Sequence, residues 1–330
     1  MAATKIDVLG IGNAIVDVLS RSDDRFLKDN ELAKGSMSLI DEAQAEELYS
    51  RMGAGIEISG GSAANTIAGI ASFGAKGAFI GKVRDDQLGK IFAHDIRSIG
   101  VDFTTPPAAS GPQTARCLVL VTPDGERTMN TFLGASQNLC VEDINENQVA
   151  AAQILYLEGY LWDPEQAKQA FLMAAKYAHD AGRQVALTLS DAFCVDRYRD
   201  EFRNLLKQDV DILFANEAEI MSLFKVSDFE DAVKLAAEEC RLAILTRSEK
   251  GCVIVKGNEC HEVAAIGIDE VVDTTGAGDL FAAGFLYGLT QNKTLPECGH
   301  LGALAANEII SHIGARPEIS LAELISSRGL

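Results

Sequence analysis

"AQILYLEG" (152–159), "PEQAKQAFLMAAKYAHDAG" (164–182) and "QVALTLS" (184–190) follow one another with short connections. The first and last are short runs rich in branched aliphatic residues, as expected for buried strands, and the middle one is long enough and helix-favouring enough to form a helix. A strand, a helix and a strand in this order predict a parallel pair joined by a crossover helix. The stretch therefore predicts an α/β fold.

The same alternation continues on both sides of this stretch. Toward the C-terminus we expect a helix, a strand, a helix and then two strands joined by a turn: "YRDEFRNLLK" (198–207), "VDILFAN" (210–216), "FEDAVKLAAEEC" (229–240) and "LAILTRSEKGCVIVK" (242–256). Toward the N-terminus, "KIDVLGIG" (5–12) and "GAFIGKV" (77–83) read as strands separated by a helix over 62–74. Strands alternating with helices predict a mostly parallel central sheet with helices on both faces.

Two segments interrupt the alternation. "ELAKGSMSLI" (31–40) and "PQTARCLVLVTPDGERTMNTF" (112–132) are β-rich without a helix between their strands, and "TPDGE" (122–126) is a hairpin turn signal. We expect a single α/β domain over residues 1–330, with a small β-sheet formed by inserted segments at about 13–40 and 108–135.

Composition limits the partners. The 330 residues include 29 basic and 48 acidic side chains, a net charge of -19 that repels nucleic acid and anionic membranes and favours a small-molecule partner. The seven cysteines are odd in number and form no C-x-x-C pair, as expected of reduced thiols, and the five histidines show no zinc-ligand spacing. With no signal-like N-terminus, we expect a cytoplasmic protein, either a monomer or a homodimer.

Two familiar nucleotide motifs fail. Gly10 and Gly12 begin a G-x-G-x-x-G pattern, but Ile15 stands where the third glycine belongs, which argues against a dinucleotide-binding oxidoreductase. "TTGAGD" (274–279) is not followed by the lysine of a Walker A loop.

The stretch "VVDTTGAGDLFAAGFLYGL" (271–289) changes from a strand-like run to a helix at Gly276, Ala277 and Gly278, directly before Asp279. Glycines and a helix N-terminus present N–H groups that attract an anion such as phosphate. The N–H groups of residues 277–279 could hold a transferred phosphoryl group, while Asp279 accepts the proton of an attacking hydroxyl. The alternative is that Asp279 only stabilises the helix dipole.

A second glycine turn lies in "SGGSAANTIAGIASFGAKGAFIGKVRDDQLG" (59–89). Gly60 and Gly61 allow the backbone to approach a ligand, and Ser62 and Asn65 lie three apart on the first helical turn, so they point the same way. Such a surface suits a polyol, although a capped helix with a tight entry turn would have the same sequence.

Together the two stretches resemble the two signature regions of the PfkB-type carbohydrate kinases, the ribokinase-like family, in the right order and over nearly the whole chain. The resemblance implies an α/β domain with a β-sheet lid, and a phosphotransferase with an alcohol group as acceptor. It implies Asp279 as catalytic base, Gly276 to Gly278 as the anion hole, and Asp17 and Asn65 as ligands of the acceptor, with Gly60 and Gly61 behind them.

The resemblance also implies an ATP side with Mg²⁺. It assigns ATP contacts to Asn216, Thr246, Ser248, Gly251 and Asn307, magnesium through water to Glu219, and, as in some members, K⁺ to Asp273 and Thr275. Ser248 stands where the family more often has glycine. Arg84 and the pair Ala115 and Arg116 also depart from usual glycines, which affects the geometry of the lid.

The acceptor is predicted from the closer similarity of "GIGNAIVD" (10–17), "GSMSLI" (35–40) and "RTMNTFLGASQNL" (127–139) to the adenosine kinase branch. This similarity predicts ATP-dependent phosphorylation of a nucleoside 5′-hydroxyl, adenosine to AMP. Asn13, Ser36, Phe132 and Tyr160 are the additional acceptor residues, and Phe132, Leu133 and Tyr160 could form apolar walls for a purine. A sugar kinase of the ribokinase or fructokinase type stays open, as does a non-catalytic binding protein with the same fold.

Overall fold

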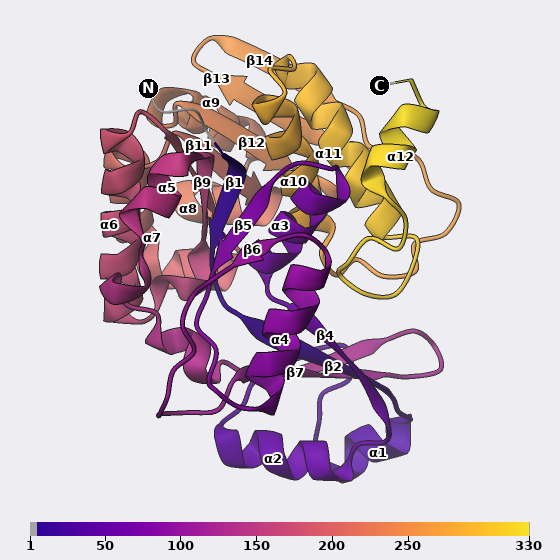
Figure 1. Cartoon of the computed structure of the whole chain (residues 1–330). Helices are drawn as coiled ribbons and strands as arrows, with labels where there is room; N and C mark the ends of the chain where they lie inside the picture. Colours follow the sequence, from indigo (N-terminus) through magenta and orange to yellow (C-terminus); the bar gives the residue numbers. More distant parts are fainter. Residues whose placement is uncertain (1–4, 330) are drawn as a thin grey trace.

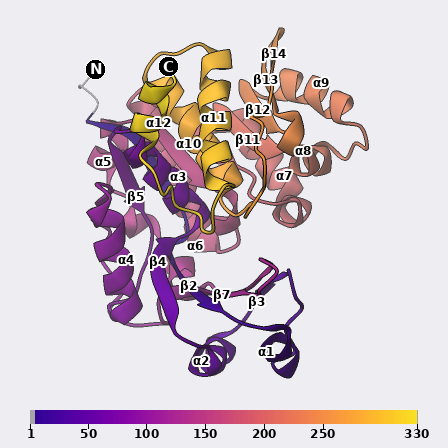
Figure 2. The same ribbon diagram turned by 90° about the vertical axis from the view of Figure 1, so that its right-hand side faces the viewer.

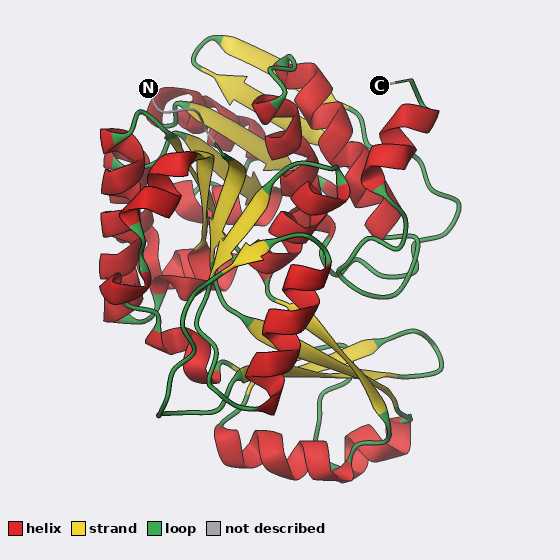
Figure 3. Cartoon of the chain, viewed as in Figure 1, coloured by secondary structure: helices red, strands yellow, loops and turns green. Residues whose placement is uncertain are grey.

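A computed structural model describes residues 5–329 of the chain, which form a larger and a smaller sheet with helices around them (Figures 1 and 3). The larger sheet has the strand order β14-β13-β12-β11-β10-β9-β1-β5-β6. In chain order its strands are β1 (Ile6–Ile11), β5 (Gly77–Ile80), β6 (Asp102–Phe103), β9 (Ala152–Glu158), β10 (Gln184–Thr188), β11 (Ile212–Asn216), β12 (Leu242–Thr246), β13 (Cys252–Lys256) and β14 (Glu259–Val263).

All neighbours from β6 to β12 are parallel, and only β13 and β14 at one edge are antiparallel. Side chains of a strand point alternately to the two faces, so each strand contributes to two cores. Val8 of β1 and Tyr156 of β9 belong to one core, whereas Leu9 and Leu157 belong to the other. This two-sided burial explains why the strands read as continuous apolar runs.

Helices cover both faces, as predicted. One core is closed by α3 (Ser62–Ser72), α4 (Gln87–Ser98), α10 (Ala277–Thr290), α11 (Leu295–Ile309) and α12 (Leu321–Ser327). The other is closed by α5 (Glu146–Ala151), α6 (Glu165–Asp180), α7 (Ala192–Gln208), α8 (Glu217–Phe224) and α9 (Phe229–Glu239). In α6 the buried residues Ala167, Ala170, Phe171 and Ala174 recur at spacings of three, one and three, which is one apolar stripe of a helix. The α/β prediction is confirmed.

The smaller sheet stands below the larger one in the view of Figure 1 and has the order β3-β8-β7-β2-β4. Its strands are β2 (Ile15–Arg21), β3 (Met37–Leu39), β4 (Gly55–Gly60), β7 (Ala115–Val121) and β8 (Arg127–Phe132). The predicted turn joins β7 to β8 as an antiparallel hairpin, with the Thr122 N–H bonded to the Glu126 carbonyl at 3.0 Å. Strand β4 belongs to this sheet although it lies outside the segments 13–40 and 108–135.

Two short helices, α1 (Asp24–Asp29) and α2 (Glu42–Arg51), lie outside the smaller sheet, as the turned view of Figure 2 shows. Residues Val16, Val18, Leu118 and Leu120 point to this outer side and are buried. The opposite face of the smaller sheet is turned toward the larger sheet. Among residues 5–329 we find no helix long and apolar enough to cross a bilayer.

The strand expected immediately before Asp279 is wrong. Between Val263 and the start of α10 the chain is irregular. Val271 and Val272 are 52% and 42% exposed, and the Val272 N–H bonds at 2.9 Å to the carbonyl of Ile310, not to a strand of the sheet. Two adjacent valines favour a strand only where a neighbouring strand offers hydrogen bonds and burial, and this segment has neither.

Candidate active site

A cavity of about 1140 Å³ lies between the larger sheet and the inner face of the smaller one. Glu158, Thr188, Asn216 and Thr246 line it, and each is the last residue of its strand, β9 to β12. Because parallel strands end at the same edge of a sheet, residues far apart in sequence meet there. The cavity thus occupies the place where α/β sheets usually bind ligands.

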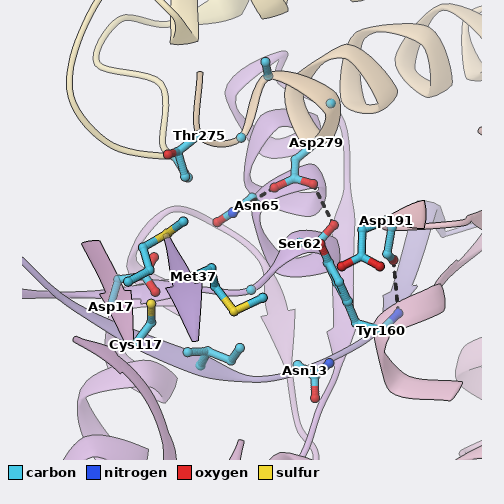
Figure 4. Close-up of a pocket in the computed structure, with 18 of the residues that line it drawn as sticks. Asn13, Asp17, Met37, Ser62, Asn65, Cys117, Tyr160, Asp191, Thr275 and Asp279 are labelled. Atoms are coloured by element: carbon cyan, nitrogen blue, oxygen red, sulfur yellow. Dashed lines mark hydrogen bonds between the residues drawn. The ribbon is translucent and has the colours of Figure 1, made fainter. Parts of the chain in front are cut away.

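The smaller sheet closes the opposite side of this cavity. Its inner face presents Asp17 together with apolar or weakly polar side chains from every strand: Ile15, Leu19, Met37, Leu39, Ile56, Ile58, Cys117, Val119, Met129 and Thr131. Several of them are unusually exposed for large apolar residues, with Ile56 at 72% and Leu39 at 57%. Figure 4 shows Met37, Cys117 and Asp17 on this side and Asp279 on the other. An apolar surface of this kind usually marks a binding site.

Asp279 lies in the first turn of α10 and points toward α3. Its carboxylate accepts hydrogen bonds from the Ser62 hydroxyl at 2.6 Å and the Asn65 amide at 3.0 Å (Figure 4). Burial raises the pKa of Asp279, while the bonds from Ser62 and Asn65 and the charge of Arg316 lower it. The two glycine turns predicted from the sequence are therefore in direct contact through these side chains.

The N-terminus of α10 faces the cavity through Gly276, Ala277 and Gly278. Gly276 has φ +79°, a conformation that glycine adopts without strain. The Ala277 N–H bonds to the Thr274 carbonyl at 3.2 Å, so it differs from the free donor that the sequence suggested. The N–H groups of Gly278 and Asp279 have no acceptor among residues 5–329, as expected for a first helical turn.

Asp17 faces Asp279 from the smaller sheet. Burial raises the pKa of Asp17 to about 6, and the positive charges of Arg316 and Arg127 oppose the rise. Gly60 pairs with Ile15 on the neighbouring strand, and a Cβ at Gly60 would come within 2.3 Å of the Asp17 carboxylate. Gly60 itself does not line the cavity; its missing side chain makes room for Asp17.

Asn13 and Glu158 form a buried polar pair at the floor of the cavity. The Asn13 amide donates to the Glu158 carboxylate at 2.7 Å and accepts from the Ser136 hydroxyl at 2.8 Å. The second Glu158 oxygen accepts the Ala63 N–H at 2.8 Å. Burial raises the pKa of Glu158 to about 7, against these two bonds. A Cβ at Gly12 would meet this carboxylate at 2.2 Å, so Gly12 serves packing rather than a dinucleotide.

The predicted ATP side is built at the end of β11. Asn216 caps α8, its amide donating to the Glu219 carboxylate at 2.6 Å while the Glu219 N–H donates back at 2.9 Å. Glu219 is buried, which raises its pKa to about 7, and the charge of Asp191 raises it further. Both acids line the cavity, as do Asn216 and its strand partner Thr246. Oxygen ligands from one or two carboxylates fit a Mg²⁺ ion that keeps its waters.

Asp273 and Thr275 do not fit a K⁺ site. Each Asp273 oxygen already accepts two donors: one from the Thr275 N–H and hydroxyl at 3.0 and 2.8 Å, the other from the Gly314 N–H at 3.0 Å and Arg127 at 2.7 Å. The ion pair with Arg127 is buried. A guanidinium thus supplies the positive charge at Asp273, and the carboxylate has no lone pair left for a cation.

Two predicted acceptor residues lie away from the cavity. Phe132 points to the outer face of β8, because Arg127, Met129 and Thr131 alternate with it and line the inner face. The apolar wall predicted for Phe132 is therefore wrong, whereas Leu133, which was predicted beside it, does line the cavity. Ser36 bonds through its hydroxyl to the Ala33 carbonyl at 2.6 Å, and its own carbonyl accepts the Met129 N–H, so it fixes the start of β3.

Three predicted ATP residues also lie outside the cavity lining. Ser248 has φ +49° in η4 (Ser248–Lys250), which explains why glycine would suit this position. A Cβ at Gly251 would meet the Val263 carbonyl at 2.0 Å, so this glycine is needed by the turn between β12 and β13. Asn307 donates to the carbonyls of Ile266 and Gly267 at 3.2 and 3.3 Å and holds the irregular segment against α11.

The structure adds residues that the sequence interpretation did not assign. Tyr160 lines the cavity as predicted. Phe193 at the start of α7 is 66% exposed and lines the same cavity, but the sequence interpretation missed it. Asp191, Arg127 and Arg316 also line the cavity. Arg127 and Arg316 each follow a glycine with positive φ, Gly125 and Gly314, but such turns are common and do not mark a site. The position of the three residues in space reveals them.

Comparison with known proteins agrees with this geometry. The model of the pfkB family carbohydrate kinases matches residues 36–321, which include both glycine turns and the Asn216–Glu219 segment. The chain belongs to the pfkB family. It is accordingly a phosphotransferase that acts on an alcohol group.

Relatives of this pfkB kinase include both sugar and nucleoside kinases. A probable sugar kinase from Rhizobium etli is 55% identical over 99% of both chains, with a TM-score of 0.92. An adenosine kinase from Sinorhizobium meliloti is 53% identical over 98% of this chain and 100% of its own, also with a TM-score of 0.92. A probable chloroplastic fructokinase-6 from Arabidopsis thaliana is 31% identical over 72% of this chain and 63% of its own length.

Proposed function

We propose that the protein transfers the γ-phosphoryl group of ATP to the 5′-hydroxyl of a nucleoside, adenosine, giving AMP and ADP. The observation that carries the proposal is the apolar inner face of the smaller sheet, which surrounds Asp17 and lies across the cavity from Asn65. A ribose needs the polar groups, but a free sugar would leave Met37, Leu39 and Ile56 in water, whereas a purine would cover them. The 53% identical adenosine kinase supports the same choice.

The chain's own residues divide the chemistry between them. In this proposal Asp17 and Asn65 hold the ribose so that its 5′-oxygen lies between Asp279 and the N-terminus of α10. The oxygen attacks the γ-phosphorus, the bond to the β-phosphate oxygen breaks, and ADP leaves with that electron pair. Asp279 takes the hydroxyl proton late in the reaction, for which a weak base suffices. The N–H groups of Gly278 and Asp279 stabilise the charge on the transferred group.

The ATP side would be provided by Asn216 and Thr246, with Glu219 and Asp191 holding a hydrated Mg²⁺ that neutralises phosphate charge. In the proposal the smaller sheet acts as a lid that excludes water before transfer. Ser248, Gly251 and Asn307 then shape the surrounding turn and loop. ATP hydrolysis without acceptor should be slow, and acceptor-independent hydrolysis as fast as the kinase reaction would contradict the role of the lid.

A sugar kinase is the second candidate, because Asp17, Asn65 and the buried Glu158 are polar groups that a free sugar could use. A panel of adenosine, other nucleosides, ribose and fructose, scored by ADP release, decides between the two. We expect adenosine to give the highest kcat/KM. Preference for a free sugar would overturn the nucleoside proposal, and measurable binding without turnover on any acceptor would indicate a non-catalytic protein.

A matched pair of variants tests the apolar walls. Phe193→Ala removes a ring at the cavity and should raise the adenosine KM at a cost of about 1–3 kcal/mol, with little change in the ATP KM. Phe132→Ala removes the same side chain from the outer face of β8 and should leave the adenosine KM unchanged. If each variant loses as much kcat/KM for ribose as for adenosine, neither ring contacts the base.

A further inference from the structure

Arg316 lies in the segment between α11 and α12 and lines the cavity beside the glycine turn of Gly60 and Gly61, which we call the acceptor turn. Its Nε and Nη2 donate to the Ser59 carbonyl at 2.9 and 2.8 Å, and Nη2 also donates to the Ser59 hydroxyl at 3.0 Å. Its Nη1 donates to the Ala64 carbonyl at 2.7 Å. One guanidinium therefore holds the chain on both sides of Gly60 and Gly61.

The same segment also supports the other glycine turn. A Cβ at Gly276 would lie 3.0 Å from the Cβ of Ala315, the residue before Arg316. The Gly314 N–H donates to Asp273, two residues before Thr275. Residues 314–316 thus connect the turn that begins α3 with the turn that begins α10.

Arg316 differs from the other buried cation of the site, Arg127, in having no carboxylate at ion-pair distance within residues 5–329. All its contacts are neutral oxygens. A buried charge that is bonded only to neutral groups is costly unless acids at longer range balance it. The acids that act on it are Asp95 from α4, Asp17 from β2 and Asp279 from α10.

We propose that Arg316 is a positioning residue that fixes the acceptor turn and keeps the carboxylates of Asp17 and Asp279 ionised in a closing, dry cavity. The inference rests on the proposed role of Asp279 as base. Without a nearby cation, two buried acids that face one ligand would take up protons as water leaves. Burial lowers the pKa of Arg316 to about 10, which still leaves it charged at neutral pH.

Other groups also affect the ionisation of Asp279, and the test must leave these groups unchanged. Ser62 and Asn65 from α3 donate hydrogen bonds to the Asp279 carboxylate. The negative charge of Asp279 in turn raises the pKa of Glu158 and of Tyr156, both in β9. Tyr160, beside β9, feels the same charge. Asp17 is further opposed by Arg127 of β8. Among residues 5–329, Arg316 is the one cation whose charge lowers the pKa of both Asp17 and Asp279. Its removal should therefore raise both pKa values together.

The test compares Arg316→Gln, which keeps donors but loses the charge, with Arg316→Lys, which keeps the charge. The matched control is Arg199→Gln, because Arg199 also bonds a serine, Ser222, through Nε at 2.8 Å to the carbonyl and Nη2 at 3.3 Å to the hydroxyl. The rate of phosphoryl transfer at saturating ATP and adenosine is followed against pH. The acid limb, where activity falls as Asp279 takes up a proton, should move up by about one pH unit or more only in Arg316→Gln.

The proposal would be overturned if both Arg316 variants lowered the melting temperature equally and the acid limb of the pH profile did not move. Arg316 would then only stabilise the fold. If Arg316→Gln alone does not fold, it is combined with Asp95→Asn. The double variant removes one cation and one of the anions that it balances, and the acid limb of the pH profile should still move up. Carboxyl NMR of ¹³C-labelled aspartate, with Asp279→Asn to assign the signal, measures the Asp279 pKa without turnover. A raised Asp279 pKa in a protein that phosphorylates nothing would support the inference while refuting the proposed function.

Discussion

The helices α3 and α10 both begin at a glycine with positive φ, Gly61 at +100° and Gly276 at +79°, and neither has a side-chain cap. Their surroundings differ. The first turn of α3 follows a strand, and its Ala63 N–H is already bonded to the carboxylate of Glu158. The first turn of α10 follows an irregular segment, and Gly278 has no atom near the place of a Cβ. The first turn of α3 is bonded to a carboxyl group of the protein itself. We propose that the first turn of α10 binds the phosphate of a ligand instead.

The largest expected effect comes from Asp279, which joins the two turns. Asp279→Asn keeps the shape of the side chain and removes the base, so kcat should fall roughly 10²- to 10⁴-fold. Acceptor and ATP binding should survive, as calorimetric titration of each ligand would show. A variant with normal single-turnover transfer and a lowered melting temperature would make Asp279 a helix-dipole residue and remove the proposed mechanism.

Alanine at the two turns should separate folding from chemistry. A Cβ at Gly61 would meet the Asn13 carbonyl at 2.1 Å in a left-handed backbone, so Gly61→Ala should lower the free energy of unfolding by at least about 2 kcal/mol. Gly278→Ala should instead stabilise the helix by about 0.5–1 kcal/mol and raise the ATP KM, because the methyl group would stand where we propose that phosphate binds. Thermal melts and ATP titration of both variants provide the check, and similar melting losses in both would contradict the contrast.

Glu158, the carboxyl group bonded to the first turn of α3, should make stability depend on pH. Its pKa rises on folding from 4.5 to about 7, so the folded state holds a proton that the unfolded state has lost. The free energy of unfolding should therefore fall as pH rises from about 4.5 to 7, by roughly 3 kcal/mol at most for this group. Glu158→Gln should flatten that slope in denaturant titrations at several pH values. An unchanged slope would show that Glu158 titrates normally.

The smallest effect is expected at the entrance to the α10 turn. Because Arg127 already pairs with Asp273, replacing K⁺ by tetramethylammonium in the assay should leave turnover unchanged. Restoration of activity by K⁺ after dialysis against tetramethylammonium would show that a cation does reach this site and that Arg127 moves away from it.

Much of the fold follows from local sequence. Strands such as Ile154–Leu157 are buried on both faces and must be continuously apolar. Helices such as α6 need one apolar stripe. Both patterns can therefore be recognised from the order of residues in the sequence. The glycine turns can also be recognised from the sequence, because Gly61 and Gly276 adopt backbone conformations that other residues avoid. Asp279 could be singled out because it stands beside such a turn.

Only the tertiary structure decided which side chains meet in the cavity. Phe132 and Leu133 are neighbours in sequence, but Phe132 ends β8 opposite Arg116 of β7, whereas Leu133 follows the strand and lines the cavity. The turns before Arg127 and Arg316 do not indicate that these side chains enter the site, yet both place positive charge on Asp17, because β8 and the 314–316 segment lie against the cavity. Charge interactions depend on distance through space, and the sequence records distance only along the chain.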